Sequence, residues 1–285
     1  MIIQRPAFPA TTHRNMALLI ALLACTGTPS AALTILGSAQ QFAVLGASTV
    51  TNTGPTTIFG DLGVSPGTAI TGLGSITLTG TVHAADAVAD QAQADLTNAM
   101  LAIAAMPVSG DLTGQTLGTD GISLLTPGVY GFDTSAQLNG LLTLDAGSNP
   151  SADFVFLIGS TLTTASSSTV QVLNGNANTR VFWHVGSAAT LGTASSFAGN
   201  ILAYTGISLG TGAQIRCGRA LAATTAVTMD TNTVINDCGA GDFGSYGFSG
   251  GTVTTAVPEP ASWALLVTGF AGIGLRLRRR TQHLA

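Results

Sequence analysis

Thr190-Leu-Gly-Thr193 is one of four short stretches that share a pattern of hydroxyl residue, apolar residue, any residue and threonine. The other three are Thr161-Leu-Thr-Thr164, Ser208-Leu-Gly-Thr211 and Thr228-Met-Asp-Thr231. They begin at positions 161, 190, 208 and 228, so the intervals are 29, 18 and 20 residues. Repeats of about 20 residues are typical of single coils of a β-helix. We therefore predict stacked coils with an insertion at 174–178 and with these apolar residues pointing inward: Leu162, Leu191, Leu209 and Met229.

The sequence around these repeats consists of short alternating apolar runs divided by Gly, Asn and Pro-Gly, which is typical of strands and turns. The exception is 84–106, which has no Gly and ends before Pro107. We predict one amphipathic helix of about 20 residues there. Its three aspartates, Asp86, Asp90 and Asp95, are expected to face solvent. Its apolar stripe is expected to comprise Val88, Ala92, Leu96, Ala99 and Ile103.

Charge is scarce: hydrophobic residues make up 46% of the 285 residues and charged residues only 8%, with no Lys. Between the two ends, three arginines face twelve aspartates, so this body carries 3 − 12 = −9. A surface of that sign repels the phosphate backbone, which argues against nucleic acid as a partner. The arginines are Arg180, Arg216 and Arg219.

The same scarcity argues against catalysis. A polysaccharide lyase or hydrolase on a β-helix needs paired carboxylates, or a base with Arg or Lys, and the aspartates of the body are scattered singly. A P-loop needs Lys, and an HExxH zinc motif needs a Glu, whereas the single Glu259 lies near the C-terminus. We expect no enzyme activity, no cofactor and no metal. His184, in the alternating run Val181-Phe-Trp-His-Val185, is expected to be a sheet-surface residue pointing opposite to Trp183.

Residues 1–32 have the features of a secretory signal: Arg14, the apolar stretch 16–24 and small residues before a cut after Ala32. The apolar core of nine residues is shorter than the ~20 that span a bilayer, which favours export over a transmembrane helix. Leu22-Leu-Ala-Cys25 leaves lipid attachment open as a weaker alternative. With Cys25 removed, Cys217 and Cys238 remain as an even pair in an oxidising compartment, and we predict a disulfide between them.

At the other end, a Gly/Ser/Thr-rich spacer at 239–256 precedes a tail at 257–285, in which an apolar stretch, 264–275, is followed by an Arg cluster. This tail resembles the tripartite PEP-CTERM sorting signal, whose matching residues here are Pro258, Glu259, Pro260, Arg278, Arg279 and Arg280. The resemblance implies an exosortase as processing partner and the cell surface of a Gram-negative, exopolysaccharide-producing bacterium. The short apolar helix then contacts the membrane only transiently, and the alternative is a permanent membrane anchor.

Stacked coils place the hydroxyl residues in columns about 4.8 Å apart, with same-face neighbours along a strand about 6.7 Å apart. The body, 33–238, resembles the microbial ice-binding family with a discontinuous β-solenoid (domain of unknown function 3494). The resemblance rests on segments such as Gly60-Asp-Leu-Gly-Val-Ser-Pro-Gly67, Leu125-Thr-Pro-Gly-Val-Tyr130 and Phe197-Ala-Gly-Asn-Ile-Leu-Ala203. It implies a right-handed solenoid, all-β apart from one long helix packed alongside, that adsorbs to ice by one flat face. Thr164-Ala-Ser-Ser167 and Thr193-Ala-Ser-Ser196 approach the family's Thr-Ala/Gly-x-Thr/Asn motif, with Ser in the last place.

We therefore expect an exported ice-binding protein, monomeric, whose partner is the ice crystal surface. A non-catalytic matrix or adhesion protein on the same fold, with exopolysaccharide as its partner, is the alternative, and an ordinary solenoid surface rich in strand-forming Thr would look similar in sequence. The expected ice-binding residues are Thr161, Thr164, Ser166, Thr190, Thr193, Ser195, Ser208, Thr211, Thr228, Thr231 and Thr233.

Overall fold

A computed structural model describes residues 35–119, 121–147, 149, 152–175 and 178–236. The predicted signal, spacer and sorting tail, and Cys238, lie outside these residues. Within the described part of the chain, no helix is long and apolar enough to cross a membrane.

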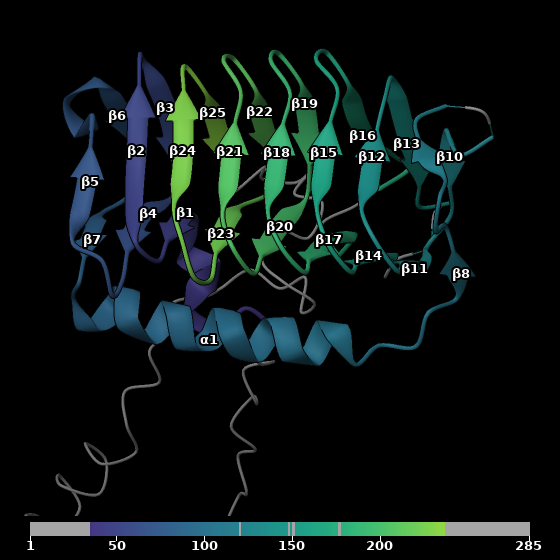
Figure 1. Cartoon of the computed structure of the whole chain (residues 1–285), viewed down its shortest axis with the longest axis horizontal. Helices are drawn as coiled ribbons and strands as arrows, with labels where there is room; N and C mark the ends of the chain where they lie inside the picture. The colour runs from purple at the N-terminus through teal and green to yellow at the C-terminus, as the bar shows by residue number, and fades with distance from the viewer. Residues whose placement is uncertain (1–34, 120, 148, 150–151, 176–177, 237–285) are drawn as a thin grey trace, which may run out of the picture. The chain divides into compact units, whose positions relative to one another are not determined.

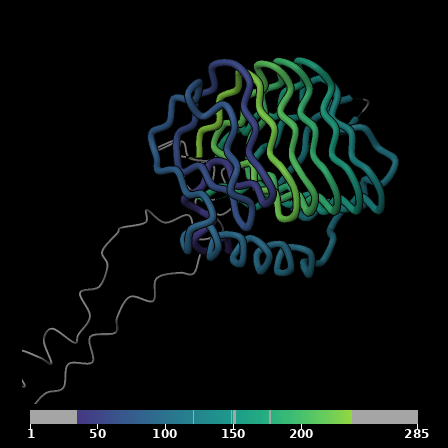
Figure 2. The backbone as a smooth tube through the Cα atoms, turned by 60° about the vertical axis from the view of Figure 1, so that its left-hand side comes forward, coloured from purple at the N-terminus to yellow at the C-terminus, as the bar shows by residue number. Residues whose placement is uncertain are grey.

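Three parallel sheets form a solenoid in which each complete coil contributes one strand to each sheet (Figures 1 and 2). Sheet A has, in spatial order, β7 (Val82–Ala84), β4 (Asp61–Val64), β1 (Phe42–Gly46), β23 (Ala220–Ala222), β20 (Asn200–Ala203), β17 (Arg180–Val185), β14 (Asp153–Ile158), β11 (Gly128–Phe132) and β8 (Gly110–Asp111). Sheet B has β5 (Ala69–Thr71), β2 (Thr49–Thr53), β24 (Val227–Asp230), β21 (Ile207–Leu209), β18 (Ala189–Leu191), β15 (Leu162–Thr164), β12 (Ala136–Leu138) and β9 (Thr116–Leu117). Sheet C has β10 (Leu124–Leu125), β13 (Leu141–Asp145), β16 (Thr169–Leu173), β19 (Ser196–Ala198), β22 (Gln214–Arg216), β25 (Thr233–Ile235), β3 (Thr56–Phe59) and β6 (Ile76–Leu78).

The coils are not stacked in the order of the sequence. The first coil, β1 to β3, lies between the coil that follows it and the last coil, β23 to β25. In Figure 2 the purple N-terminal coil accordingly lies against the yellow-green C-terminal one. After β7 the chain passes through α1 (Ala87–Ala104) to the far end, where β8 starts the run of coils that leads back (Figure 1). The predicted discontinuous solenoid with one long helix is confirmed.

The interior is filled by the inward side chains of all three sheets, including the four apolar residues predicted from the repeats: Leu162, Leu191, Leu209 and Met229. An aromatic stack runs through it, because Tyr130, Phe156 and Trp183 occupy matching positions in β11, β14 and β17. The rings of Phe156 and Trp183 lie 3.8 Å apart between centroids and are nearly parallel at 6°. The Trp183 indole N–H donates to the Ala198 carbonyl at 3.0 Å, so its polar atom is satisfied in the core.

Helix α1 covers the outer side of sheet A and makes a second apolar cluster with it. Ala92, Leu96, Ala99 and Ile103 are buried as predicted, whereas Val88 is 48% exposed, so its place in the stripe was wrong. Val88 lies in the first turn, two residues after the capping residue Asp86, and its backbone N–H donates to the Asp86 side chain. A short 3-10 helix, η1 (Gly37–Gln41), packs against α1, and a second, η2 (Leu73–Ser75), precedes β6.

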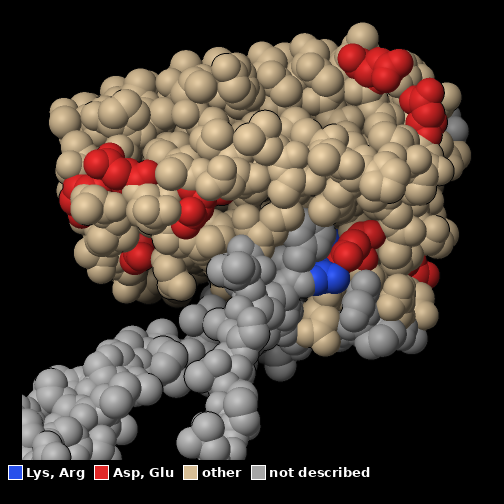
Figure 3. All heavy atoms as spheres, turned by 90° about the horizontal axis from the view of Figure 1, so that it is seen from below, with Lys and Arg blue, Asp and Glu red and all other residues tan. Residues whose placement is uncertain are grey.

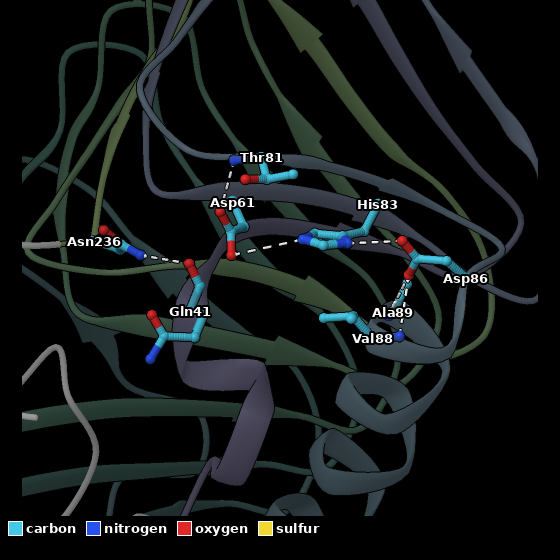
Figure 4. Close-up of polar contacts among 8 residues, drawn as sticks. All are labelled: Gln41, Asp61, Thr81, His83, Asp86, Val88, Ala89 and Asn236. Carbon is cyan, nitrogen blue, oxygen red and sulfur yellow. Dashed lines mark hydrogen bonds and ion pairs between the residues drawn. The ribbon is translucent and has the colours of Figure 1, made fainter. Parts of the chain in front are cut away.

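The start of α1 is fixed by a chain of polar contacts (Figure 4). Asp86 is the N-cap: its Oδ1 accepts from the backbone N–H groups of Val88 and Ala89 at 3.1 and 2.9 Å. Its Oδ2 lies 2.8 Å from His83 Nδ1, and His83 Nε2 is 4.0 Å from Asp61 Oδ2. Asp86 is therefore a structural cap, and Asp95 likewise accepts from the backbone and hydroxyl of Ser38 at 2.7 Å, so neither is a merely solvated charge.

Candidate functional site

Two of the three sheets present an open outer face. The outward side chains of sheet A, such as Phe42, Phe182 and Leu202, are buried under α1 and its neighbours. His184 also belongs to this side: Trp183 points into the core, and His184 is half-buried on the outer side, as predicted. Burial lowers the pKa of His184. Of the three sheets, only B and C therefore leave an outer face open to a large partner.

Sheet B carries one hydroxyl residue at the centre of most of its strands, and the strand register aligns them into a single row. Thr190 pairs with Thr163 on one side and with Ser208 on the other, and Ser208 pairs with Thr228. Thr228 pairs in turn with Thr51. We call this row the central ladder; from one end to the other it comprises Thr71, Thr51, Thr228, Ser208, Thr190, Thr163, Gln137 and Thr116.

The ladder is built on backbone spacing, because neighbouring strands lie about 4.8 Å apart. Two of its hydroxyl groups also contact each other directly: Thr228 Oγ1 donates to Ser208 Oγ at 3.1 Å. Thr163, Thr190, Ser208 and Thr228 are all exposed. The result is a regular line of methyl and hydroxyl groups open to solvent.

Small residues flank this line. Two residues before Thr190, Ser208 and Thr228 stand Ala188, Gly206 and Ala226, and two residues after Thr163, Thr190 and Ser208 stand Ala165, Gly192 and Gly210. At Gly192 an added Cβ would lie 2.5 Å from the Ala165 carbonyl carbon, and at Gly210 it would lie 2.8 Å from the Leu191 carbonyl oxygen. The coils approach too closely there for any side chain. The face around the ladder is therefore low in relief.

The predicted residues divide into three groups. Thr190, Ser208 and Thr228 lie on the ladder, and Thr161 stands two residues before the ladder residue Thr163, with its Oγ1 2.8 Å from Ser135 Oγ. Ser166, Thr193 and Thr211 are exposed at the corner between sheets B and C, where the backbone of one coil bonds to the next: Ser167 N to Thr193 O at 2.9 Å and Ala194 N to Thr211 O at 3.0 Å. Thr231 is at the same corner with a positive φ of 57°.

Three predicted residues are placed elsewhere, and their assignment to a shared exposed face was wrong. Thr164 is 3% exposed and points inward, where its Oγ1 accepts from the Gly192 N–H at 2.9 Å. Ser195 is 1% exposed, and its Oγ donates to the Gly192 carbonyl at 2.7 Å, which closes the turn from inside. Thr233 belongs to β25 of sheet C, where it pairs with Gln214 and Thr57.

Thr164 was misplaced because of a shift of register. Because Thr163 pairs with Thr190, the first repeat begins at residue 163 rather than at 161, and its interval to 190 is 27 residues. The extra length of this coil lies between Leu173, where β16 ends, and Arg180, where β17 begins; 176–177 within it lie outside the described residues.

Sequence reasoning missed the part of the ladder that comes from the N-terminal strands. Thr49-Val-Thr-Asn-Thr53 forms β2, with Thr51 on the ladder and Thr49 and Thr53 two residues to either side. The alternation of threonines was a visible signal. Its position beside β24 was not, because it depends on the insertion of the first coil next to the last.

The outer face of sheet C is less regular. Leu141, Leu173 and Phe59 are 45%, 45% and 42% exposed. The exposed Arg216 belongs to β22, which lies between the strands of Leu173 and Phe59. Long and charged side chains of this kind give uneven relief. Sheet B is therefore the stronger candidate for recognising a flat partner.

Charged residues are nearly absent from the strands that carry the ladder. Of the residues in the eight strands of sheet B, Asp230 alone is charged. Seen from the side of α1, the acidic atoms lie in groups toward the left and the right of the view, and uncharged atoms fill the upper part between them (Figure 3). The Arg180–Asp153 ion pair joins β17 to β14 of sheet A, where burial raises the pKa of Asp153 against the opposing pull of Arg180.

Cys217 is disulfide-bonded, and its partner lies outside the described residues. The pairing with Cys238 stays a prediction. The described residues hold no group of three His, Cys, Asp or Glu side chains that could ligate a metal ion.

The fold and the open ladder define a class: parallel β-solenoids of discontinuous coil order, with a helix along one sheet and a flat hydroxyl-bearing face on another. Residues 44–235 match the family model described as Ice-binding-like. The chain belongs to this family. Residues 256–280 match the PEP-CTERM protein-sorting motif, in agreement with the predicted tail.

Named relatives and solved structures agree with this assignment. The chain is 47% identical over 273 residues to an ice-binding protein of Nostoc sp. (strain HG1), covering 94% of this chain and 97% of the relative. It is 32% identical to an ice-binding protein of Flavobacterium frigoris (strain PS1), covering 70% and 75%. The crystal structure of an ice-binding protein from the Antarctic ascomycete Antarctomyces psychrotrophicus superimposes with a TM-score of 0.67 at 39% identity, covering 72% of this chain and 98% of that one. Another, from an Antarctic biological consortium, gives 0.66 at 44% identity, covering 71% and 90%.

Proposed function

We propose that this chain is an exported ice-binding protein that adsorbs to ice through the open face of sheet B. The observation that carries the proposal is the register of the central ladder, which aligns Thr163, Thr190, Ser208, Thr228 and Thr51 across five adjacent strands. Family membership indicates ice as the ligand, and the ladder indicates the outer face of sheet B as the binding surface.

The mechanism is adsorption without covalent chemistry. Methyl groups order a thin layer of water over the face, hydroxyl groups anchor it, and the layer merges with the ice lattice. Rigidity matters because a mobile surface loses conformational entropy when it binds, whereas this surface is ordered on folding. The stacked coils, the glycine contacts between them and the aromatic stack beneath provide that rigidity.

The ends of the chain give the address. An N-terminal signal would direct export, and an exosortase would cut near Pro258-Glu259-Pro260, within the matched sorting motif. The mature protein then acts outside the cell as a monomer, either free or held in surface exopolysaccharide. Retention there would place the ice-binding face where crystals first meet the cell.

A matched pair of variants tests the proposed face. Thr190→Tyr places a bulky ring at the centre of the ladder, and Thr233→Tyr places the same ring on an outward strand position of sheet C. We expect the purified protein to inhibit ice recrystallisation and to show thermal hysteresis. Thr190→Tyr should lose most of that activity and Thr233→Tyr should keep it, with both variants retaining the melting temperature of the parent.

Other results would redirect the proposal. Loss of activity in Thr233→Tyr alone would move the ice-binding face to sheet C. An inactive parent that binds polysaccharide would instead support the matrix or adhesion function.

A further inference from the structure

Asp230 interrupts the otherwise uncharged outer face of sheet B. It lies on β24 two residues after the ladder residue Thr228 and, by the alternation of the strand, on the same outer side. Its side chain is partly exposed.

The corresponding positions of neighbouring coils hold small uncharged residues. Thr53 is its register partner in β2. Two residues after the ladder residues of β15, β18 and β21 stand Ala165, Gly192 and Gly210. A carboxylate therefore occurs in a column that is elsewhere methyl, hydroxyl or bare backbone.

The carboxylate also engages two hydroxyl groups of the neighbouring corner. Thr211 Oγ1 donates to Oδ2 at 2.5 Å, and Thr231 Oγ1 donates to Oδ1 at 3.0 Å. Both donors belong to the residues that the sequence placed on the recognition face. Their protons point at Asp230 and not at the water over the face.

An ionised carboxylate holds its own hydration shell, and removing or reorganising that shell is costly unless the new surroundings replace its hydrogen bonds. Water over Asp230 is therefore oriented by the charge, whereas water over the rest of the ladder is ordered by methyl and hydroxyl groups. The two arrangements compete where β24 meets β2.

We propose that Asp230 limits the strength of ice binding: its charge disrupts the ordered water at this point of the face, and neutralising it strengthens adsorption. This inference rests on the proposed function of the sheet B face. If Asp230 limits ice binding, its substitution should increase activity. If Asp230 instead contributed a contact to ice, its substitution should decrease activity.

Three variants separate charge from shape. Asp230→Asn keeps the shape and removes the charge, Asp230→Gly reproduces Gly192 and Gly210, and Asp230→Glu keeps the charge. We expect thermal hysteresis at equal protein concentration to rise about twofold or more in the first two and not in the third. Thr190→Tyr added to Asp230→Asn should abolish the gain, because both act on the same face. Melting temperatures are measured for every variant, so that a change in folded fraction is recognised.

The outcomes distinguish this inference from the function beneath it. If Thr190→Tyr abolishes activity but Asp230→Asn and Asp230→Gly leave it equal or lower with an unchanged melting temperature, Asp230 does not limit binding and the inference is overturned alone. If the parent and Asp230→Asn are both inactive, the proposed function and the inference fail together. An increase in Asp230→Glu equal to that in Asp230→Asn would show that charge is not the cause.

Discussion

Thr163 and Thr190 are register partners in β15 and β18, and their side chains are adjacent on the exposed face of sheet B. Thr164, the next residue along the chain, points into the core and accepts a hydrogen bond from the Gly192 backbone. Two consecutive threonines thus have opposite roles, one at the surface and one in the packing between coils. Substitutions at these two positions should therefore affect different properties.

Thr163→Tyr is expected to reduce ice-recrystallisation inhibition strongly while leaving stability within about 0.5 kcal/mol, because it adds bulk at an exposed surface position. Thr164→Val should lower the stability and leave ice-recrystallisation inhibition largely unchanged. Removing the hydroxyl leaves the Gly192 N–H without its acceptor, at a cost of about 1–3 kcal/mol. Ice assays and urea denaturation on both proteins check this. Equal effects on activity would contradict the assignment of Thr163 to the recognition face.

Thr51→Tyr tests the discontinuous coil order in functional terms. Thr51 pairs with Thr228 although the two are far apart in sequence, so the N-terminal strand extends the ladder. We expect lower thermal hysteresis than in the parent. Thr77→Tyr, on an exposed strand position of β6 in sheet C, is the control with the same chemical change. Thermal hysteresis equal to that of the parent in Thr51→Tyr would mean that the ice contact ends before β2.

Trp183→Ala should be severely destabilising, because it removes a fully buried indole that stacks on Phe156, packs at a tilt against Phe197 and donates to the Ala198 carbonyl. Large aromatic-to-alanine changes in cores cost about 3–5 kcal/mol. Denaturant unfolding gives the value, and Trp183→Phe, which keeps most of the packing, should cost less. A loss below about 1 kcal/mol for Trp183→Ala would show that the stack contributes little.

Acid should weaken the anchoring of α1 through Asp86. The backbone N–H of Ala89 holds the pKa of this carboxyl below its ordinary value, with the His83 hydrogen bond adding to the effect. A carboxyl whose pKa is lower in the folded state stabilises the fold above its unfolded pKa, and that contribution is lost as the pH falls through the folded pKa. The melting temperatures of the parent and Asp86→Ala should therefore differ near neutral pH and converge in acid. Asp133→Ala, at an exposed position, is the control; a pH-independent difference for Asp86→Ala would refute the linkage.

The local features of this protein were predictable because they depend on short-range pattern. Alternating apolar residues identified inward positions such as Leu191 and Met229. An uninterrupted Ala-rich stretch identified the helix. The sorting tail was recognisable from its Pro-Glu-Pro triplet, apolar stretch and Arg cluster, which follow one another in that order. The cap at Asp86 was missed because the pattern placed the helix start near residue 84, and Val88 was misassigned for the same reason.

Which hydroxyl groups share a face was decided by the stacking of coils. Unequal insertions shift the register, so Thr163 and not Thr161 meets Thr190, and the fourth residue of the first repeat becomes the buried Thr164. The placement of β2 beside β24, which completes the ladder with Thr51, follows from long-range strand pairing. Pattern along the chain reports whether a side chain points in or out; only pairing between distant strands, driven by burial of the common core, determines its neighbours.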